Sequence, residues 1–173
     1  TIPSRRIIYG WHVNPNESNG SAAITYLEDA VGMTPAYMDS ANNTFEYGSF
    51  ANAFFIPKPC MLKSDGTVDY YLDPNDYTKK VDGTASDISN YAYNGNAMME
   101  FPKIWFKFVA GVAEGEGYFY VSNQQVDDSY HCWANYDSDG NQTDHFYMSI
   151  YNGVIYDSKM RSLSGKKLSP WST

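Results

Sequence analysis

Cysteine and basic residues are scarce in this chain, and each scarcity narrows the range of functions. Cys60 and Cys132 are the two cysteines among 173 residues, which is too few for a disulfide-built scaffold. We expect two buried free thiols rather than one long-range bridge. The chain has only 12 Lys and Arg against 20 Asp and Glu, which gives a formal net charge of −8. Because a phosphate backbone is bound through Lys and Arg, this balance argues against nucleic acid and anionic membrane surfaces as partners.

Long apolar runs are also missing. No stretch approaches the roughly 20 apolar residues of a membrane-spanning helix, so membrane insertion is not expected. The first residues, Thr1–Arg6, include neither a Met nor the apolar stretch of a signal peptide. The chain ends at Ser169–Thr173 without an obvious closing element. We therefore expect it to be a fragment of a longer protein.

No catalytic signature is present either. The sequence contains no Gly-x-Ser-x-Gly elbow, and its three histidines stand outside any catalytic pattern. Glycoside hydrolysis needs two carboxylates held across a cleft, and among 20 acids without a motif any chosen pair would be arbitrary. We expect a non-enzymatic protein, and a polysaccharide-degrading enzyme is the least favoured of the functions considered.

Aromatic residues, in contrast, are abundant. There are 16 Tyr, 9 Phe and 4 Trp, or 17% of the chain, and in the second half they form short segments separated by acidic, Gly-rich turns. Tyr and Trp combine a rigid apolar body with a polar tip, which suits half-exposed sheet faces and recognition surfaces. An aromatic β-sheet core explains most of them equally well. The sequence predicts a β-rich α+β fold of short antiparallel strands with one N-terminal amphipathic helix.

The helix is predicted at Ser21–Val31. Its apolar residues Ile24, Leu27 and Val31 fall at helical spacing, and Gly32 supplies a stop. A serine near its start can cap the first turn by accepting a backbone hydrogen bond. This is the one segment whose periodicity favours a helix.

The rest of the first half is assigned from composition and turn chemistry. Arg6–Val13 is rich in β-branched and aromatic residues, which predicts a first strand. Cys60–Lys63 and Val68–Leu72 flank an Asp-Gly turn, which predicts a hairpin. A short helical turn is expected around Phe50–Phe54. Residues 73–97 are polar and without a steady period, so we expect a functional or mobile loop there.

The second half is predicted to be rich in strands separated by turn residues. A proline at position 102 indicates an edge or a bulge at that end of its strand. We divide the chain into residues 1–97, with helix, hairpin and loop, and residues 98–173, with the strands, packed together as one unit. The candidate strands are Met98–Val109, Gly117–Ser122, Ser129–Tyr136, His145–Tyr151 and Val154–Tyr156.

The best candidate binding surface lies where aromatic residues flank the acidic turn Asp137–Asn141. Flat rings beside oxygen acceptors suit sugars, whose C–H faces stack on the rings while their hydroxyls bond to carboxylates and amides. The alternative is that alternate residues of each strand fill the core. The candidate ligand-binding residues are Trp133, Tyr136, Asp137, Asp139, His145 and Tyr147.

Metal sites are not predicted. His131 and Cys132 are adjacent, so on a strand they point to opposite faces and do not form a zinc-binding pair. The turn Asp137–Asn141 has the oxygen density of a calcium loop, but it lacks the spaced ligands and the distal Glu of an EF-hand. A plain hairpin turn is favoured, because Asp, Gly and Asn are its usual residues. We expect no cofactor, with Ca²⁺ as the alternative at this turn.

Several segments resemble a known family. Those in the second half are Met99–Lys107, Tyr118–Ser122, Asp144–Gly153 and Arg161–Gly165. The first of them has the sequence Met-Glu-Phe-Pro-Lys-Ile-Trp-Phe-Lys, and together they resemble phage and prophage tail proteins of the tail-fibre or receptor-binding type. Tyr9–Asn14 and Thr25–Met33 resemble related proteins from phages of gut Gram-positive bacteria. The resemblance covers nearly the whole chain, and its motifs are structural rather than catalytic.

The resemblance implies a C-type-lectin-like fold, begun by these strands, and a role in host attachment. The implied partners are a host cell-surface receptor or glycan and other virion proteins, and the implied location is the virion or the extracellular space. The implied assembly is a homo-oligomer, a trimer by analogy. Some relatives are targets of diversity-generating retroelements.

One departure limits what the resemblance transfers. In the family the lectin-like domain and its ligand-contacting surface continue well past the Arg-Ser-Leu-Ser-Gly element, whereas this chain ends eight residues after Gly165. No receptor-contact residue is therefore carried over. The alternative function is a bacterial surface module that binds a glycan through its aromatic residues.

Overall fold

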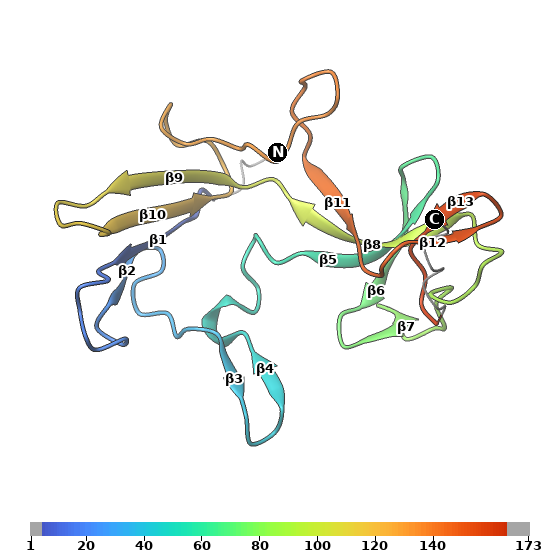
Figure 1. Ribbon diagram of the computed structural model, residues 1–173, viewed down its shortest axis with the longest axis horizontal. Helices are drawn as coiled ribbons and strands as arrows, with labels where there is room; N and C mark the ends of the chain where they lie inside the picture. Colours follow the sequence, from blue (N-terminus) through green and yellow to red (C-terminus); the bar gives the residue numbers. More distant parts are fainter. Residues whose placement is uncertain (1–4, 166–173) are drawn as a thin grey trace, which may run out of the picture. The chain divides into compact units, whose positions relative to one another are not determined.

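The computed structural model describes residues 5–165, which form short antiparallel strands (Figure 1). Within this range there is one 3-10 turn, η1 (Gly48–Phe50), and no α-helix. No helix of the described range is long and apolar enough to cross a membrane. The strands are β1 (Ile8–Val13), β2 (Ile24–Glu28), β3 (Tyr37–Asp39), β4 (Thr44–Glu46), β5 (Lys58–Lys63), β6 (Val68–Asp73), β7 (Asp76–Lys80), β8 (Gly95–Pro102), β9 (Trp105–Ala110), β10 (Gly117–Ser122), β11 (His145–Ser149), β12 (Val154–Tyr156) and β13 (Lys159–Arg161).

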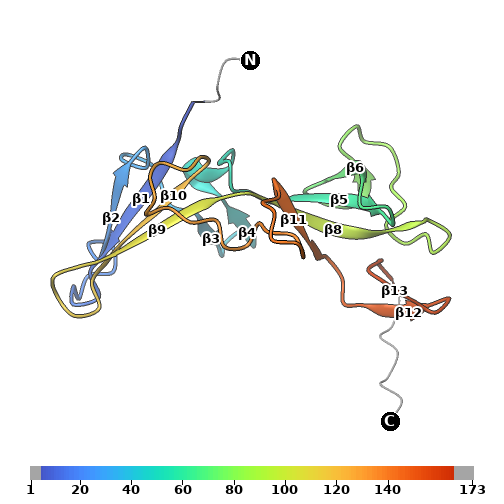
Figure 2. The same ribbon diagram turned by 90° about the horizontal axis from the view of Figure 1, so that it is seen from above.

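Contacts divide the chain into two compact units that interleave in the sequence. Unit 1 contains the described residues up to Ile56 together with Lys103–Asp144. Unit 2 contains Pro57–Pro102 and the described residues from His145 onward. The chain passes between the units three times, and its path can be followed by colour in Figure 2. Each unit has its own main sheet.

Unit 1 is organised around a four-stranded antiparallel sheet in the order β2-β1-β10-β9. Its central pairing places Ile8 opposite Ser122 and Val13 opposite Gly117, so segments far apart in the sequence form the middle of the sheet. Close packing requires glycine at position 10 of β1. A Cβ there would lie 2.9 Å from Cδ1 of the Tyr120 ring on the neighbouring strand.

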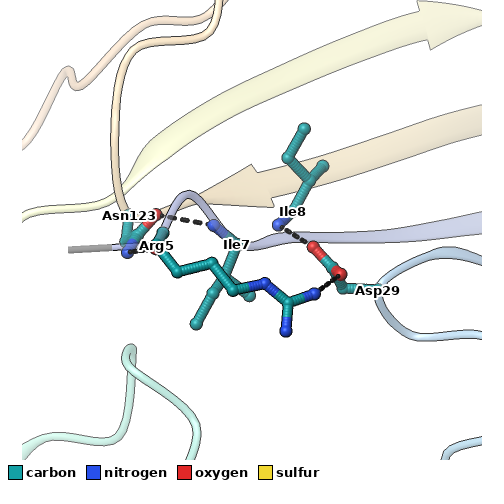
Figure 3. Close-up of polar contacts among 5 residues, drawn as sticks. All are labelled: Arg5, Ile7, Ile8, Asp29 and Asn123. Atoms are coloured by element: carbon teal, nitrogen blue, oxygen red, sulfur yellow. Dashed lines mark hydrogen bonds and ion pairs between the residues drawn. The ribbon is translucent and has the colours of Figure 1, made fainter. Parts of the chain in front are cut away.

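Two polar side chains fix the start of β1. The Asp29 carboxylate accepts hydrogen bonds from the Arg5 guanidinium at 2.8 Å and from the Ile8 amide at 2.9 Å. Asn123 accepts a hydrogen bond from the Ile7 amide at 2.9 Å and donates one to the Arg5 carbonyl at 3.1 Å (Figure 3). Because Asp29 follows β2 and Asn123 follows β10, these bonds tie β1 to both of its neighbours.

Unit 2 is organised around a five-stranded antiparallel sheet in the order β11-β8-β5-β6-β7. Its buried core consists of Met61, Leu72, Ile88, Ala97 and Leu163, with half-buried tyrosines packed around it. Three of these residues come from the adjacent strands β5, β6 and β8, and the other two come from loops. Burial of these apolar side chains is the main favourable contribution to the stability of this unit.

Two buried polar residues, Arg161 at the end of β13 and Ser162 after it, attach this part of the chain to β8 and to the residues just before β8. Arg161 donates hydrogen bonds from Nη2 to the Gly95 carbonyl at 2.7 Å and to the Tyr93 carbonyl. Ser162 donates its hydroxyl to the Ala97 carbonyl at 2.8 Å, and its own carbonyl accepts from the Ala97 amide at 2.8 Å. These bonds hold Leu163 in the core, so this part of the Arg-Ser-Leu-Ser-Gly segment is structural.

The predicted helix at Ser21–Val31 is wrong. Ile24–Glu28 is strand β2, which pairs along its whole length with β1. β-branched and aromatic residues favour an extended chain, and a helix this short gains little without a core to pack on. Val31 is 69% exposed, so the apolar stripe that suggested a helix has no such core. Glu28, with φ of 54°, ends the strand.

The β-rich, antiparallel part of the prediction is confirmed. Strand β1 and the hairpin β5–β6 form where expected, with Gly66 at φ of 86° in the connecting turn. Strand β10 has the predicted bounds, Gly117–Ser122. The strand predicted at Met98–Val109 is instead two strands, β8 and β9, with the break at residues 103–104, directly after Pro102.

Three further segments differ from the expectation. Residues 73–97 are not structureless, because β7 pairs with β6 there. Ser129–Tyr136 is not a strand, and it contributes isolated bridges at His131 and Tyr136. A turn precedes it, since the Asp127 carboxylate accepts a hydrogen bond from the Ser129 amide at 2.8 Å. The helical turn expected at Phe50–Phe54 is the 3-10 turn η1, which ends at Phe50.

Substitutions at Asp29 separate the charge of this side chain from its role as an acceptor. Asp29→Ala removes the acceptor of the Ile8 amide and is expected to lower the free energy of unfolding by about 1–2 kcal/mol. Asp29→Asn keeps an acceptor and loses an ion pair whose Arg5 side chain is 81% exposed, so its cost is expected to stay within about 0.5 kcal/mol. Urea denaturation measures both, and equal losses in the two variants would contradict this account.

Candidate aromatic binding face

One face of the unit 1 sheet carries a ladder of aromatic rings. Trp11 of β1 lies opposite Phe119 of β10, and Phe119 lies opposite Phe108 of β9. Residues paired in this way point to the same face of a sheet, so their rings meet. The Trp11 and Phe119 centroids are 5.6 Å apart in a stacked pair, and those of Phe108 and Phe119 are 5.0 Å apart. The ladder therefore crosses three strands.

Trp133 extends this ladder beyond the sheet. Its ring centroid lies 5.7 Å from that of Phe106 on β9, and the His131 ring stacks on it at 5.3 Å. Phe106 and His131 exchange two backbone hydrogen bonds, of 2.8 and 2.9 Å, which position the segment that carries Trp133. Trp133 nevertheless remains 68% exposed. The structure thus places this candidate residue at the open end of a larger aromatic surface.

A groove of about 590 Å³ opens on the same face of the sheet. Trp11 belongs to both the ladder and the groove. Tyr9, two residues before it on β1, packs edge-on against Phe50 at 5.7 Å and Phe55 at 5.8 Å. No charged side chain is among the described residues that line the groove. We call ladder and groove together the aromatic face, comprising Tyr9, Trp11, Tyr26, Phe45, Phe50, Phe55, Phe106, Phe108, Phe119 and Trp133.

The acidic turn predicted to take part in binding lies in unit 1, and its Asp137 carboxylate forms hydrogen bonds within the turn. The Asp137 carboxylate accepts hydrogen bonds from the amides of Asp139 at 2.9 Å and Asn141 at 2.8 Å. These bonds, with that from the Asn141 backbone first, lower the pKa of Asp137. Tyr136 is 49% exposed, and its hydroxyl accepts a hydrogen bond from Gln142 at 3.2 Å. The described ring contacts do not join Tyr136 to Trp133.

The remaining two candidates, His145 and Tyr147, lie on β11 in unit 2. Their ring centroids are 5.0 Å apart. The Tyr147 hydroxyl donates to Glu100 at 3.1 Å, and the Tyr71 hydroxyl donates to the same carboxylate at 3.0 Å. Burial first, and then the contact with Glu100, raises the pKa of Tyr147. The six predicted residues are therefore divided between the two units, and these two belong to a tyrosine–glutamate cluster.

Both cysteines are buried free thiols. Cys60 lies on β5 in unit 2, and burial, with a smaller contribution from Glu100, raises its pKa to about 12. Cys132 lies in unit 1 beside His131, whose ring stacks on Trp133. Within residues 5–165 no three His, Cys, Asp or Glu side chains gather in a way that would hold a metal ion.

Comparisons with known protein families, with curated proteins and with solved structures give no match to this chain.

Sequence reasoning missed the groove. Phe45, Phe50 and Phe55 line it, and the only element expected near them from the sequence is the short helical turn at Phe50–Phe54. The signal that was available is the density of rings in residues 45–55. Without the register of β1 and β10, however, nothing in the sequence places those rings over Tyr9 and Trp11.

The burial of Cys60 predicts slow chemical modification. The thiolate is the reactive form, and a pKa of about 12 against an ordinary 9.0 leaves roughly a thousandfold less thiolate at neutral pH, because each pKa unit is a factor of ten. We expect native Cys60 to be alkylated by iodoacetamide at pH 8 about that much more slowly than in denaturant, as measured by peptide mass spectrometry. Rapid native labelling, or a Cys60–Cys132 disulfide, would contradict this expectation.

Proposed function

We propose that this chain is a non-enzymatic component of a phage tail that acts in host attachment or supports a receptor-binding domain. Two kinds of support meet in this proposal. The first is the resemblance of segments such as Met99–Lys107 and Arg161–Gly165 to phage tail proteins. The second, and the observation that carries the proposal, is the exposed aromatic face of unit 1.

The exposed rings of the aromatic face favour the binding of a partner there. Phe108 and Trp133 of the ladder and Phe45 of the groove are 52%, 68% and 55% exposed. Soluble monomers rarely expose large contiguous apolar patches, and Phe, Tyr and Trp are enriched at protein interfaces. The partners that fit the proposed role are other virion chains, including further copies of this chain, and a receptor or glycan on the host cell.

The charge of the chain supports the same class of partner. A formal net charge of −8 keeps the protein soluble and disfavours nucleic acid. The groove of the aromatic face, by contrast, has no charged lining among the described residues. Recognition there would rest on ring packing and desolvation, as at the centre of a protein interface.

Assembly is the first test. Virion fibres are closed symmetric oligomers, so we expect the purified chain to sediment as a homo-oligomer, with a trimer of the 19.5 kDa chain favoured by analogy. We also expect its peptides in mass spectra of purified particles of the phage that encodes it. A stable monomer that is absent from those particles would contradict the proposal.

A second candidate function is a bacterial surface module that binds a glycan. The observation that favours it is Trp133, an exposed ring held in place by His131 and Phe106. A sugar can stack its C–H face on such a fixed ring at little entropic cost. A glycan-binding module of this kind requires neither a phage particle nor an oligomer.

Paired substitutions test the glycan reading. Trp133→Ala and Tyr136→Ala are expected to weaken binding on a glycan array roughly three- to tenfold each, the effect of losing one ring contact. Tyr156→Ala is the control, because Tyr156 is 48% exposed, nearly as much as Tyr136, and lies in unit 2. Circular dichroism monitors the fold. Unchanged binding in both test variants would exclude this site.

A further inference from the structure

Unit 2 contains a hollow of about 310 Å³ at the β6–β7 turn, separate from the aromatic face. Ligand sites in proteins range from about 300 to 1,000 Å³, so this one suits a small ligand. Its lining comes from three places in the sequence: residues 74–78, Ile88, and the pair Tyr151 and Ser164. Several segments thus converge on one small space.

The walls of the hollow are held in place by the core. The rings of Tyr77 and Tyr151 are half-buried and pack against the cluster that includes Ile88. The Ser86 hydroxyl donates to the Tyr77 carbonyl at 2.7 Å, and the Ser164 amide donates to the Ile88 carbonyl at 2.8 Å. A ligand would therefore meet rings that are already positioned, which lowers the entropic cost of binding.

Polar groups line the hollow beside these rings. The Asp76 carboxylate accepts a hydrogen bond from the Thr78 hydroxyl at 2.5 Å and pairs with Lys79 at 3.0 Å. These contacts, the Thr78 bond first, lower the pKa of Asp76, so it is an ionised acceptor at neutral pH. Asn75 uses its backbone amide to bond Asp73, while its side-chain amide has no partner among the described residues.

This combination selects a class of ligand. Tyr77, Tyr151 and Ile88 give the lining an apolar part that suits the C–H face of a pyranose, and a carboxylate with an amide suits its hydroxyl groups. An anion would meet the Asp76 carboxylate and no Lys or Arg among the described lining residues. A purely apolar ligand would make no use of the Asn75 amide, the one of these groups without a partner among the described residues. We infer that this hollow is a binding site for a neutral saccharide.

The inference goes beyond the proposed tail function, because it assigns a second site with its own ligand in the other unit. Its test uses purified protein and free sugars, without cells or particles. A negative result there would leave the virion experiment unaffected, and absence of the chain from particles would leave the sugar site standing.

Saturation-transfer and amide-shift NMR on the 173-residue chain provide the test. The probes are the methyl glycosides of glucose, galactose and N-acetylglucosamine, with the methyl α-glycoside of sialic acid as the anionic comparison. At least one neutral glycoside is expected to bind and to shift amides in residues 75–78 and at Tyr151 and Ser164. The sialoside is expected not to bind.

Two variants locate the site without depending on one that fails to fold. Asn75→Ala, in an exposed turn, is expected to weaken binding about fivefold through one lost hydrogen bond. Tyr77→Leu keeps apolar volume against the core but removes the ring, and is expected to weaken binding about tenfold. Asn152→Ala and Tyr156→Leu are matched controls outside the lining and are expected to bind normally.

Three results would overturn the assignment. One is the absence of saturation transfer to every neutral glycoside. Another is binding of the sialoside as tightly as the neutral sugars. The last is unchanged affinity in both Asn75→Ala and Tyr77→Leu, with the fold of each variant verified by its amide spectrum.

Discussion

The need to cover one face of the β2-β1-β10-β9 sheet shapes unit 1. A four-stranded sheet is stable only when a face is packed against something, and the described part of unit 1 offers no helix for that purpose. The face is covered by aromatic rings of the sheet itself, with Phe119 stacked on Trp11 on one side and tilted against Phe108 on the other. These rings are only partly buried, so they also form part of the surface of the unit.

Unit 2 meets the same requirement in a more usual way. Aliphatic residues such as Met61 and Leu72 are fully buried, and Arg161 and Ser162 use backbone carbonyls of β8 and its approach as partners. Residues of the segments that resemble phage tail proteins have structural roles in this unit. Glu100 accepts hydrogen bonds from two tyrosines and Arg161 anchors the end of the described chain, which are structural roles. The exposed aromatic face of unit 1 is the surface that we propose for attachment.

Local chemistry allowed much of the strand pattern to be predicted. Gly66 predicted its hairpin because a tight turn needs positive φ, and β10 was predicted from its run of aromatic and β-branched residues. The helix at Ser21–Val31 failed because long-range pairing of β2 with β1 outweighs a three-residue apolar period. That pairing joins elements which no local pattern connects.

The candidate site shows the same division. Trp133 could be singled out because an aromatic residue near an acidic turn is visible in the sequence. Its ring contacts are Phe106 and His131, and these two residues are joined to each other by an isolated bridge that has no sequence signature. The groove depends on the β1–β10 register and on the packing of Phe50 against Tyr9, so it emerges only in three dimensions.

We propose that a partner covers the aromatic face of unit 1 in an assembled phage particle. Hydroxyl-radical footprinting with mass spectrometry, applied to the free chain and to the chain in particles, measures this directly. We expect Trp133, Phe108 and Phe45 to lose most of their reactivity in the particle, while Tyr156 of unit 2 serves as the reference ring. Equal reactivity of all three rings in the free and assembled states would contradict it.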